Sequence, residues 1–175
     1  MSHGVAGHRG LGVGKNEGMH LTSQLDFAAP PAAVAAMLTD RDFLERVCAA
    51  SDAIEHSVQV DGDRTTLSRT LRAPSAAAKF TGDTITIVEE TTWGPAGADG
   101  SRHGELNLRV PGLPVEMTGT AALRPGGKGT TIAYDADLKV NIPFVGKKLE
   151  QSASPAVLEG IAVQQRVGDD WLAGH

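Results

Sequence analysis

Four polar side chains fall on otherwise apolar faces of segments that alternate like β-strands: His56, Arg69, Glu89 and Tyr134. In a strand, every second residue points to the same side of the sheet. A buried charge costs several kcal/mol unless it is paired. Arg69 and Glu89 lie on consecutive strands and can pair with each other. The alternation therefore places a small polar group inside an apolar face.

This polar group has three interpretations, and the sequence leaves all three open. The first is structural, a buried ion pair with a hydrogen-bonded histidine and tyrosine in the core. The second is the polar end of an apolar pocket, which would orient a ligand's carboxylate, hydroxyl or carbonyl. The third is catalysis, with His56 or Glu89 as general base toward a bound polyketide-like carbonyl compound. No residue is assigned as catalytic.

Other chemistry has little support in the residue pattern. Cys48 is the single cysteine, so neither a disulfide framework nor a cysteine metal site is expected. Gly12 to Lys15 lacks the spacing of a phosphate-binding loop, and there is no Gly-x-Ser-x-Gly motif. The remaining histidines show no spacing typical of metal ligands: His3, His8, His20, His103 and His175. We predict no metal ion and no cofactor.

The elements that position the four polar residues follow from the period of the apolar residues. Residues 19–27 alternate as a half-buried strand, and Pro30-Pro31 opens the first of two short helices. A period of two then returns in six segments separated by turn residues, which predicts an antiparallel meander. These six segments are 53–60, 64–72, 83–93, 102–110, 114–124 and 129–142. In 83–93 either face is compatible with burial.

Residues 145–172 form the longest segment with helical spacing, and they predict one long C-terminal helix. Its apolar stripe is small in the middle, at Ala153, Ala156 and Gly160. Small residues over a concave sheet leave space for a pocket, or they permit close packing; both readings stand. Pro155 predicts a kink or break between Ser152 and Pro155.

If the space is a pocket, its predicted walls come from both the sheet and the helix. Arg69, Glu89 and His56 form its polar side. The other predicted ligand-binding residues are Leu71, Met117, Tyr134, Ala136, Leu138, Ala156 and Gly160.

Length, charge and composition narrow the classes of partner. The 175 residues carry a net charge of −5 with bases and acids interspersed, and aromatic residues make up 4%. Without a basic run, nucleic acid and anionic membrane surfaces are not expected partners. No apolar run approaches about 20 residues, so no membrane span is expected, and no signal-peptide core is visible. We expect a cytoplasmic protein with residues 1–18 disordered and residues 19–175 forming one domain.

The chain resembles the helix-grip fold of the START/SRPBCC superfamily, and more narrowly an uncharacterised family common in actinobacteria. The resemblance spans about residues 19–172. It rests on the runs 28–31 to 38–40, 82–83 leading to 92–93, 115–119 and, most specifically, 140–150 (VNIPFVGKKLE). Two departures are a proline-poor segment 74–80 and Pro155 inside the helix. The resemblance implies an α+β fold in which a curved seven-stranded antiparallel sheet wraps a long C-terminal helix over a cavity.

Three functions are compatible with this fold. The first is a binder or carrier of a small apolar, lipid- or polyketide-like molecule. The second is a cyclase, dehydratase or hydrolase that uses the same cavity. The third is a protein-interaction module. A His–carboxylate pair open to the cavity would favour the enzyme, and a filled core with an exposed apolar patch would favour the interaction module. The oligomeric state is left open.

Overall fold

A computed structural model describes residues 18–174, so the segment predicted to be disordered, 1–18, lies outside the described residues except for Gly18. Seven strands and four helices follow in order. They are β1 (Met19–Phe27), α1 (Pro31–Leu38), α2 (Arg41–Ala50), β2 (Glu55–Asp61), β3 (Arg64–Arg72), α3 (Ala78–Thr81), β4 (Thr84–Trp93), β5 (Arg102–Arg109), β6 (Val115–Gly126), β7 (Gly129–Val140) and α4 (Gly146–Ala173).

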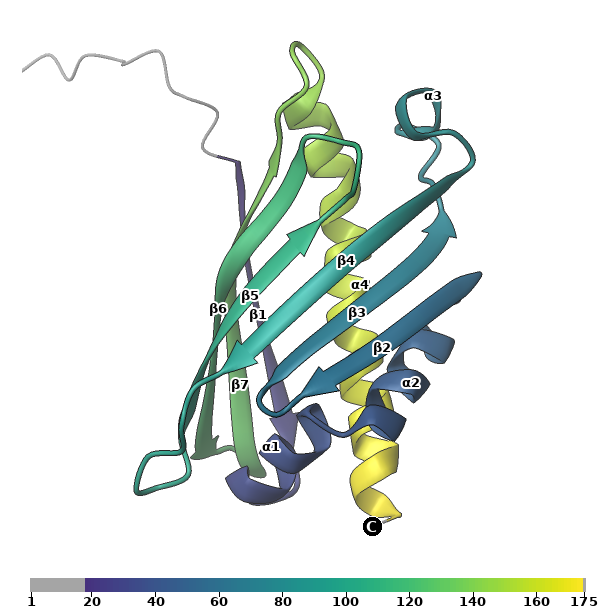
Figure 1. Cartoon of the computed structure of the whole chain (residues 1–175). Helices are drawn as coiled ribbons and strands as arrows, with labels where there is room; N and C mark the ends of the chain where they lie inside the picture. Colours follow the sequence, from purple (N-terminus) through teal and green to yellow (C-terminus); the bar gives the residue numbers. More distant parts are fainter. Residues whose placement is uncertain (1–17, 175) are drawn as a thin grey trace, which may run out of the picture.

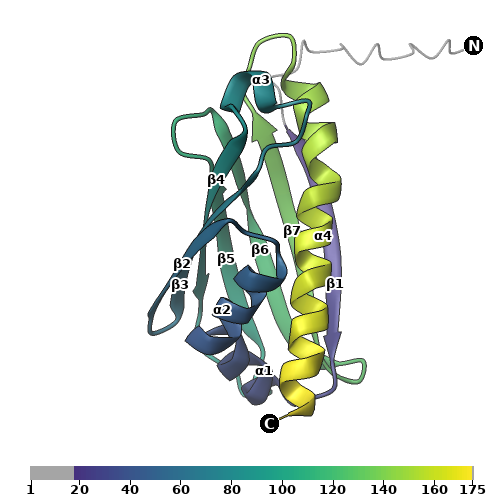
Figure 2. The ribbon, with the colours of Figure 1, turned by 90° about the vertical axis from the view of Figure 1, so that its right-hand side faces the viewer.

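The strands form one antiparallel sheet in the order β1-β7-β6-β5-β4-β3-β2. The sheet curves around α4, which lies along its concave side (Figures 1 and 2). The predicted helix-grip fold is therefore confirmed, with strand ends within about two residues of those predicted from alternation. None of the helices in residues 18–174 combines the length and hydropathy needed to cross a bilayer.

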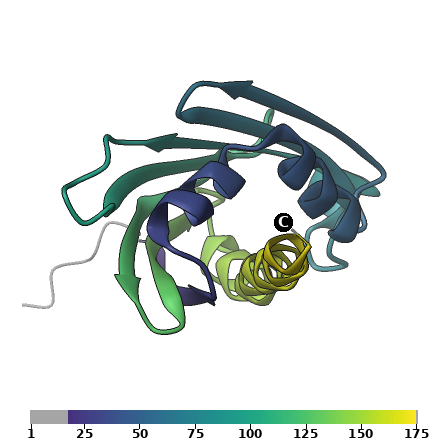
Figure 3. The same ribbon diagram turned by 90° about the horizontal axis from the view of Figure 1, so that it is seen from below.

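Helices α1 and α2 carry the chain from one edge of the sheet to the other, because β1 and β2 are the two edge strands. Seen from below, they close the lower end of the curved sheet beside the C-terminal end of α4 (Figure 3). Asp40 caps α2 by accepting hydrogen bonds from the backbone N–H groups of Asp42 and Phe43. The buried side chains of α1 and α2 then fill the lower core.

The C-terminal half of α4 packs closely on this lower core. Trp171 meets the ring of Phe43 edge to face, with ring centres 5.8 Å apart. At Gly168 the helix approaches β1 so closely that an added Cβ would lie 2.4 Å from Cε1 of Phe27. Glycine at this position is what permits the approach.

The middle of α4 is different. A Cβ added at Gly160 would meet nothing within 4 Å. Further toward the N-terminus of the helix, Ala153 and Val157 pack against a second, smaller apolar cluster on β5, β6 and β7. The same helix is therefore close-packed at one end and stands over open space at its centre.

Of the two alternatives predicted at Pro155, the break is wrong, because α4 runs as one helix from Gly146 to Ala173, and the kink stays a prediction. Proline cannot donate to the carbonyl of Gln151 four residues earlier. The hydroxyl of Ser154 donates to that carbonyl instead, at 3.2 Å. The neighbouring serine thus replaces the missing hydrogen bond, and the helix continues.

The contrast between the two glycines predicts opposite responses to alanine. Gly168→Ala should lower the free energy of unfolding by about 1–3 kcal/mol, because the new methyl group overlaps Phe27. Gly160→Ala should leave it unchanged or raise it by up to about 1 kcal/mol, because alanine favours the helix and meets no neighbour. Urea denaturation of the two variants and the parent measures both effects. Equal destabilisation of the two variants would contradict the open space at Gly160.

Candidate functional site

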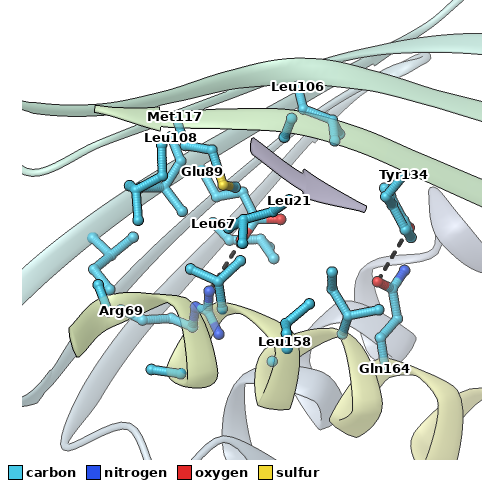
Figure 4. A pocket seen from close by; sticks show the side chains of 18 of the residues that line it. Leu21, Leu67, Arg69, Glu89, Leu106, Leu108, Met117, Tyr134, Leu158 and Gln164 are labelled. Atoms are coloured by element: carbon cyan, nitrogen blue, oxygen red, sulfur yellow. Dashed lines mark hydrogen bonds and ion pairs between the residues drawn. The ribbon is translucent and has the colours of Figure 1, made fainter. Parts of the chain in front are cut away.

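A cavity of about 270 Å³ lies between the concave face of the sheet and the central part of α4. Figure 4 shows its wall, with side chains from the sheet facing those of the helix. Most of the wall is aliphatic. Strand β4 contributes Ile85, Ile87, Glu89, Thr91 and Trp93, which settles which of its two faces turns inward. The inward face of β3 contributes Thr65, Leu67, Arg69 and Leu71.

All the predicted ligand-binding residues except His56 lie in this wall. Met117, Ala136 and Leu138 are buried members of the second, smaller apolar cluster on β5, β6 and β7. Gly160 stands over the open space, and Ala156 is exposed where the cavity opens. Whether these residues contact a ligand stays a prediction.

His56 is the residue that the structure places elsewhere. It lies on the edge strand β2, whose first half is left uncovered, and the preceding Ile54 is 55% exposed. The Nε2 atom of His56 is 2.6 Å from Oε2 of Glu45 on α2. His56 is not part of the cavity wall. The expected position at the polar side of the pocket is therefore wrong, because an edge strand beside α2 offers this histidine a carboxylate partner outside the cavity.

Arg69 and Glu89 form an ion pair in the cavity wall, with Nη2 of Arg69 3.0 Å from Oε2 of Glu89. They are diagonal neighbours on β3 and β4, since Arg69 is opposite Ile87 and Leu67 is opposite Glu89. The side chain of Arg69 is 12% exposed and that of Glu89 33%. The Nε atom of Arg69 is buried, with no hydrogen-bond partner among residues 18–174. One buried donor in the wall thus has no acceptor within the described part of the chain.

Tyr134 and Gln164 form a second polar contact across the cavity, from β7 to α4 (Figure 4). The Tyr134 hydroxyl donates to Oε1 of Gln164 at 3.2 Å. Burial, together with the negative charge of Glu89, raises the pKa of Tyr134 well above its usual range. The phenol therefore keeps its proton at neutral pH and acts as a hydrogen-bonding group. Gln164 was not predicted, although it lies one helical turn after Gly160.

The charges of the cavity wall nearly cancel. Its charged side chains are Arg69, Glu89 and Arg72, and Arg72 is exposed. The interior therefore holds one cation and one anion, already paired. Such a site can accept and donate hydrogen bonds without a net charge to neutralise.

Comparisons with known proteins agree with this fold. The curated relatives include the uncharacterized protein Rv0481c of Mycobacterium tuberculosis, 27% identical over 93 residues, which are 52% of this chain and 53% of that protein. The chain therefore matches about half the length of the curated relatives.

Solved structures resemble it over most of the chain. Protein TTHA0849 of Thermus thermophilus superposes with a TM-score of 0.59 at 18% identity, covering 87% of this chain and 95% of that chain. A STAR-related lipid transfer protein of Xanthomonas axonopodis has a TM-score of 0.59 at 15% identity, covering 88% and 85%. A START superfamily protein of Mycobacterium smegmatis has a TM-score of 0.53 at 12% identity, covering 87% and 98%. These similarities confirm the START-type fold that the sequence predicted.

A family model named "Protein of unknown function (DUF2505)" matches residues 22–172. Because that match covers most of the chain, the protein belongs to the DUF2505 family.

Proposed function

We propose that this protein binds a small, mostly apolar molecule that carries one neutral hydroxyl or carbonyl group, in the cavity between the sheet and α4. The observation that carries this proposal is the open space under Gly160. Protein interiors are normally close-packed, and voids larger than a water molecule are rare. An aliphatic cavity beneath the small residues Ala153, Ala156 and Gly160 of an unbroken helix is typical of a ligand site.

The volume limits the size of the ligand. An apolar cavity of about 150 Å³ is enough to hold benzene, and this cavity is about 270 Å³. Small-molecule sites begin near 300 Å³. A single medium-length acyl chain or a compact polyketide-like ring system fits these dimensions, with room at the mouth for part of the molecule to extend.

The polar pair favours a neutral group over a carboxylate. A ligand hydroxyl can accept a hydrogen bond from the Arg69 guanidinium, whose side chain is 12% exposed, and donate one to Glu89; a carbonyl can accept from the same guanidinium. A carboxylate would meet the negative charge of Glu89, 3.0 Å from the same guanidinium. The name of one structural neighbour, a STAR-related lipid transfer protein, supports an amphipathic ligand.

Enzymatic chemistry has less support. The His–carboxylate pair of His56 and Glu45 lies outside the cavity wall. Burial raises the pKa of the Cys48 thiol to about 11, so this thiol is not activated as a nucleophile. Binding without turnover is therefore the function that we propose.

A phenylalanine at position 160 should fill the cavity. Gly160→Phe should fold, and it should abolish the fluorescence increase of N-phenyl-1-naphthylamine, a neutral apolar probe, that the parent protein gives. Gly160→Ala is the matched control, since one methyl group occupies little of the cavity and should leave probe binding nearly unchanged. Urea denaturation of the same samples tests folding. In a closed interface the phenylalanine would instead cost about 1–3 kcal/mol or more.

Two results together would contradict the cavity. One is the absence of a probe signal from the parent protein, and the other is strong destabilisation by Gly160→Phe. A probe signal that survives Gly160→Phe would place the binding site elsewhere.

The polar end is tested by removing both charges, because removing one leaves the other unpaired. Arg69→Met combined with Glu89→Leu replaces the polar end of the cavity with apolar side chains of similar size. Displacement of the neutral probe by decan-1-ol should weaken by roughly tenfold or more in this variant, the worth of a hydrogen bond to a charged group. Affinity for the probe itself should change little. In the parent, decan-1-ol should compete better than decanoate at pH 8, and the opposite order would contradict a neutral head group.

A further inference from the structure

Three connections at one end of the molecule expose apolar and basic side chains together. These are the segment 73–83 with α3, the β5–β6 connection and the β7–α4 connection, all at the upper end in Figures 1 and 2. Phe144 precedes α4 and is fully exposed, at 107% of its reference area. Phe80 on α3 is 39% exposed, and the ammonium group of Lys79 lies 5.3 Å from the centre of its ring. Exposed apolar side chains mark a contact surface where they gather on one face of a protein.

Phe144 is held outward by an ordered turn. Its φ of 69° lies in the left-handed region, which a bulky side chain rarely adopts. The Gly146 N–H donates to the Ile142 carbonyl at 2.9 Å, and the Asn141 N–H donates to the Pro114 carbonyl at 2.9 Å. The backbone thus adopts an unfavourable conformation at a residue whose side chain is not buried by any part of residues 18–174.

The charge of this end is opposite to that of the whole chain, which is −5. The segments 72–83, 109–116 and 139–150 contain six basic residues and three acidic ones, a net charge of +3. One of the acids, Glu150, is only 2% exposed and accepts a hydrogen bond from the Val140 N–H. Lys147 and Lys148 directly follow the exposed turn, and both are exposed. The fold thus brings together basic residues that are far apart in the sequence. Because the sequence contains no basic run, this basic end was not predicted.

This end also contains one side of the cavity mouth. Leu71, Arg72 and Pro74 line the cavity and lead into α3. Across from them, Ala156 and Leu158 of α4 line it and are exposed. A molecule that leaves the cavity between these two sides emerges beside the basic end.

We propose that this end, with Phe80, Phe144, Lys79, Lys147 and Lys148, docks on the surface of an anionic lipid bilayer. Aromatic tips surrounded by lysines suit an interface where rings enter the headgroup region and ammonium groups meet lipid phosphates. A protein partner would need a broad complementary area of about 800 Å², and isolated tips on separate connections offer less. The role of this docking rests on the proposed function, because docking would let an apolar ligand pass between the bilayer and the cavity. Its measurement needs no ligand.

The test is co-sedimentation of the full chain with vesicles. Phosphatidylcholine vesicles with about 30% phosphatidylglycerol should bind the protein, pure phosphatidylcholine vesicles much less, and added salt should weaken binding. The double variant Lys147→Gln/Lys148→Gln should lose roughly tenfold or more of the affinity, and Phe144→Ala about fivefold. The matched controls lie elsewhere: Ile54→Ala removes another exposed apolar side chain, and Arg124→Gln/Lys128→Gln removes the same charge near the opposite end. Both controls should bind like the parent.

Three results would overturn the docking surface. They are no binding of the parent to anionic vesicles, an equal loss in the control variants, or self-association of the parent that Phe144→Ala abolishes, which would make a second copy the partner. The two proposals fail separately. Gly160→Phe should keep vesicle binding while it loses the apolar probe, and Phe144→Ala should keep the probe while its affinity for vesicles falls about fivefold.

Discussion

The structure depends on how closely one long helix can approach a curved sheet. At Gly168 the approach is limited by the ring of Phe27, and an added methyl group has no room. Eight residues earlier, at Gly160, the same helix faces open space. The lower end of the sheet is filled by α1, α2 and the C-terminal turns of α4, so the helix is fixed there. At its other end, Glu150 ties it to the last residue of β7. The small residues between these anchors leave a volume that the sheet does not fill.

The polar groups in that volume gain their significance from its shape. Arg69 and Glu89 form an ion pair, and the Tyr134 hydroxyl donates a hydrogen bond to Gln164 across the cavity. In a close-packed core, these contacts would serve only to stabilise the fold. Here they border an opening, and the buried Nε of Arg69 has no acceptor among residues 18–174. The structural and functional interpretations of the ion pair are therefore compatible, because a pair that stabilises the wall also presents hydrogen-bonding groups to whatever occupies the cavity.

The strands, the long helix and most of the cavity wall could be predicted because alternation determines which side chains share a face. Leu71, Met117 and Leu138 lie in the wall for that reason. The predicted position of His56 was wrong because alternation does not reveal which strand lies at the edge of the sheet. It also does not reveal that α2 places Glu45 beside this strand. The predicted break at Pro155 was wrong because the prediction considered only the missing N–H of proline. It did not consider the hydroxyl of Ser154, which donates to the Gln151 carbonyl. Gln164 and the basic end depend on which distant segments the fold brings together, and no local pattern contains that information.

The claim on which the rest depends is that an apolar ligand occupies the space beneath the middle of α4. Intermolecular nuclear Overhauser effects between decan-1-ol and the methyl groups of the protein test it most directly. We expect contacts to the methyl groups of Met117, Ala136 and Ala153, which border the cavity, and none to Met37, which is 1% exposed in the lower core. Contacts spread over exposed methyl groups, or no contacts to Met117 and Ala153 at saturating alcohol, would show that the space is not a binding site.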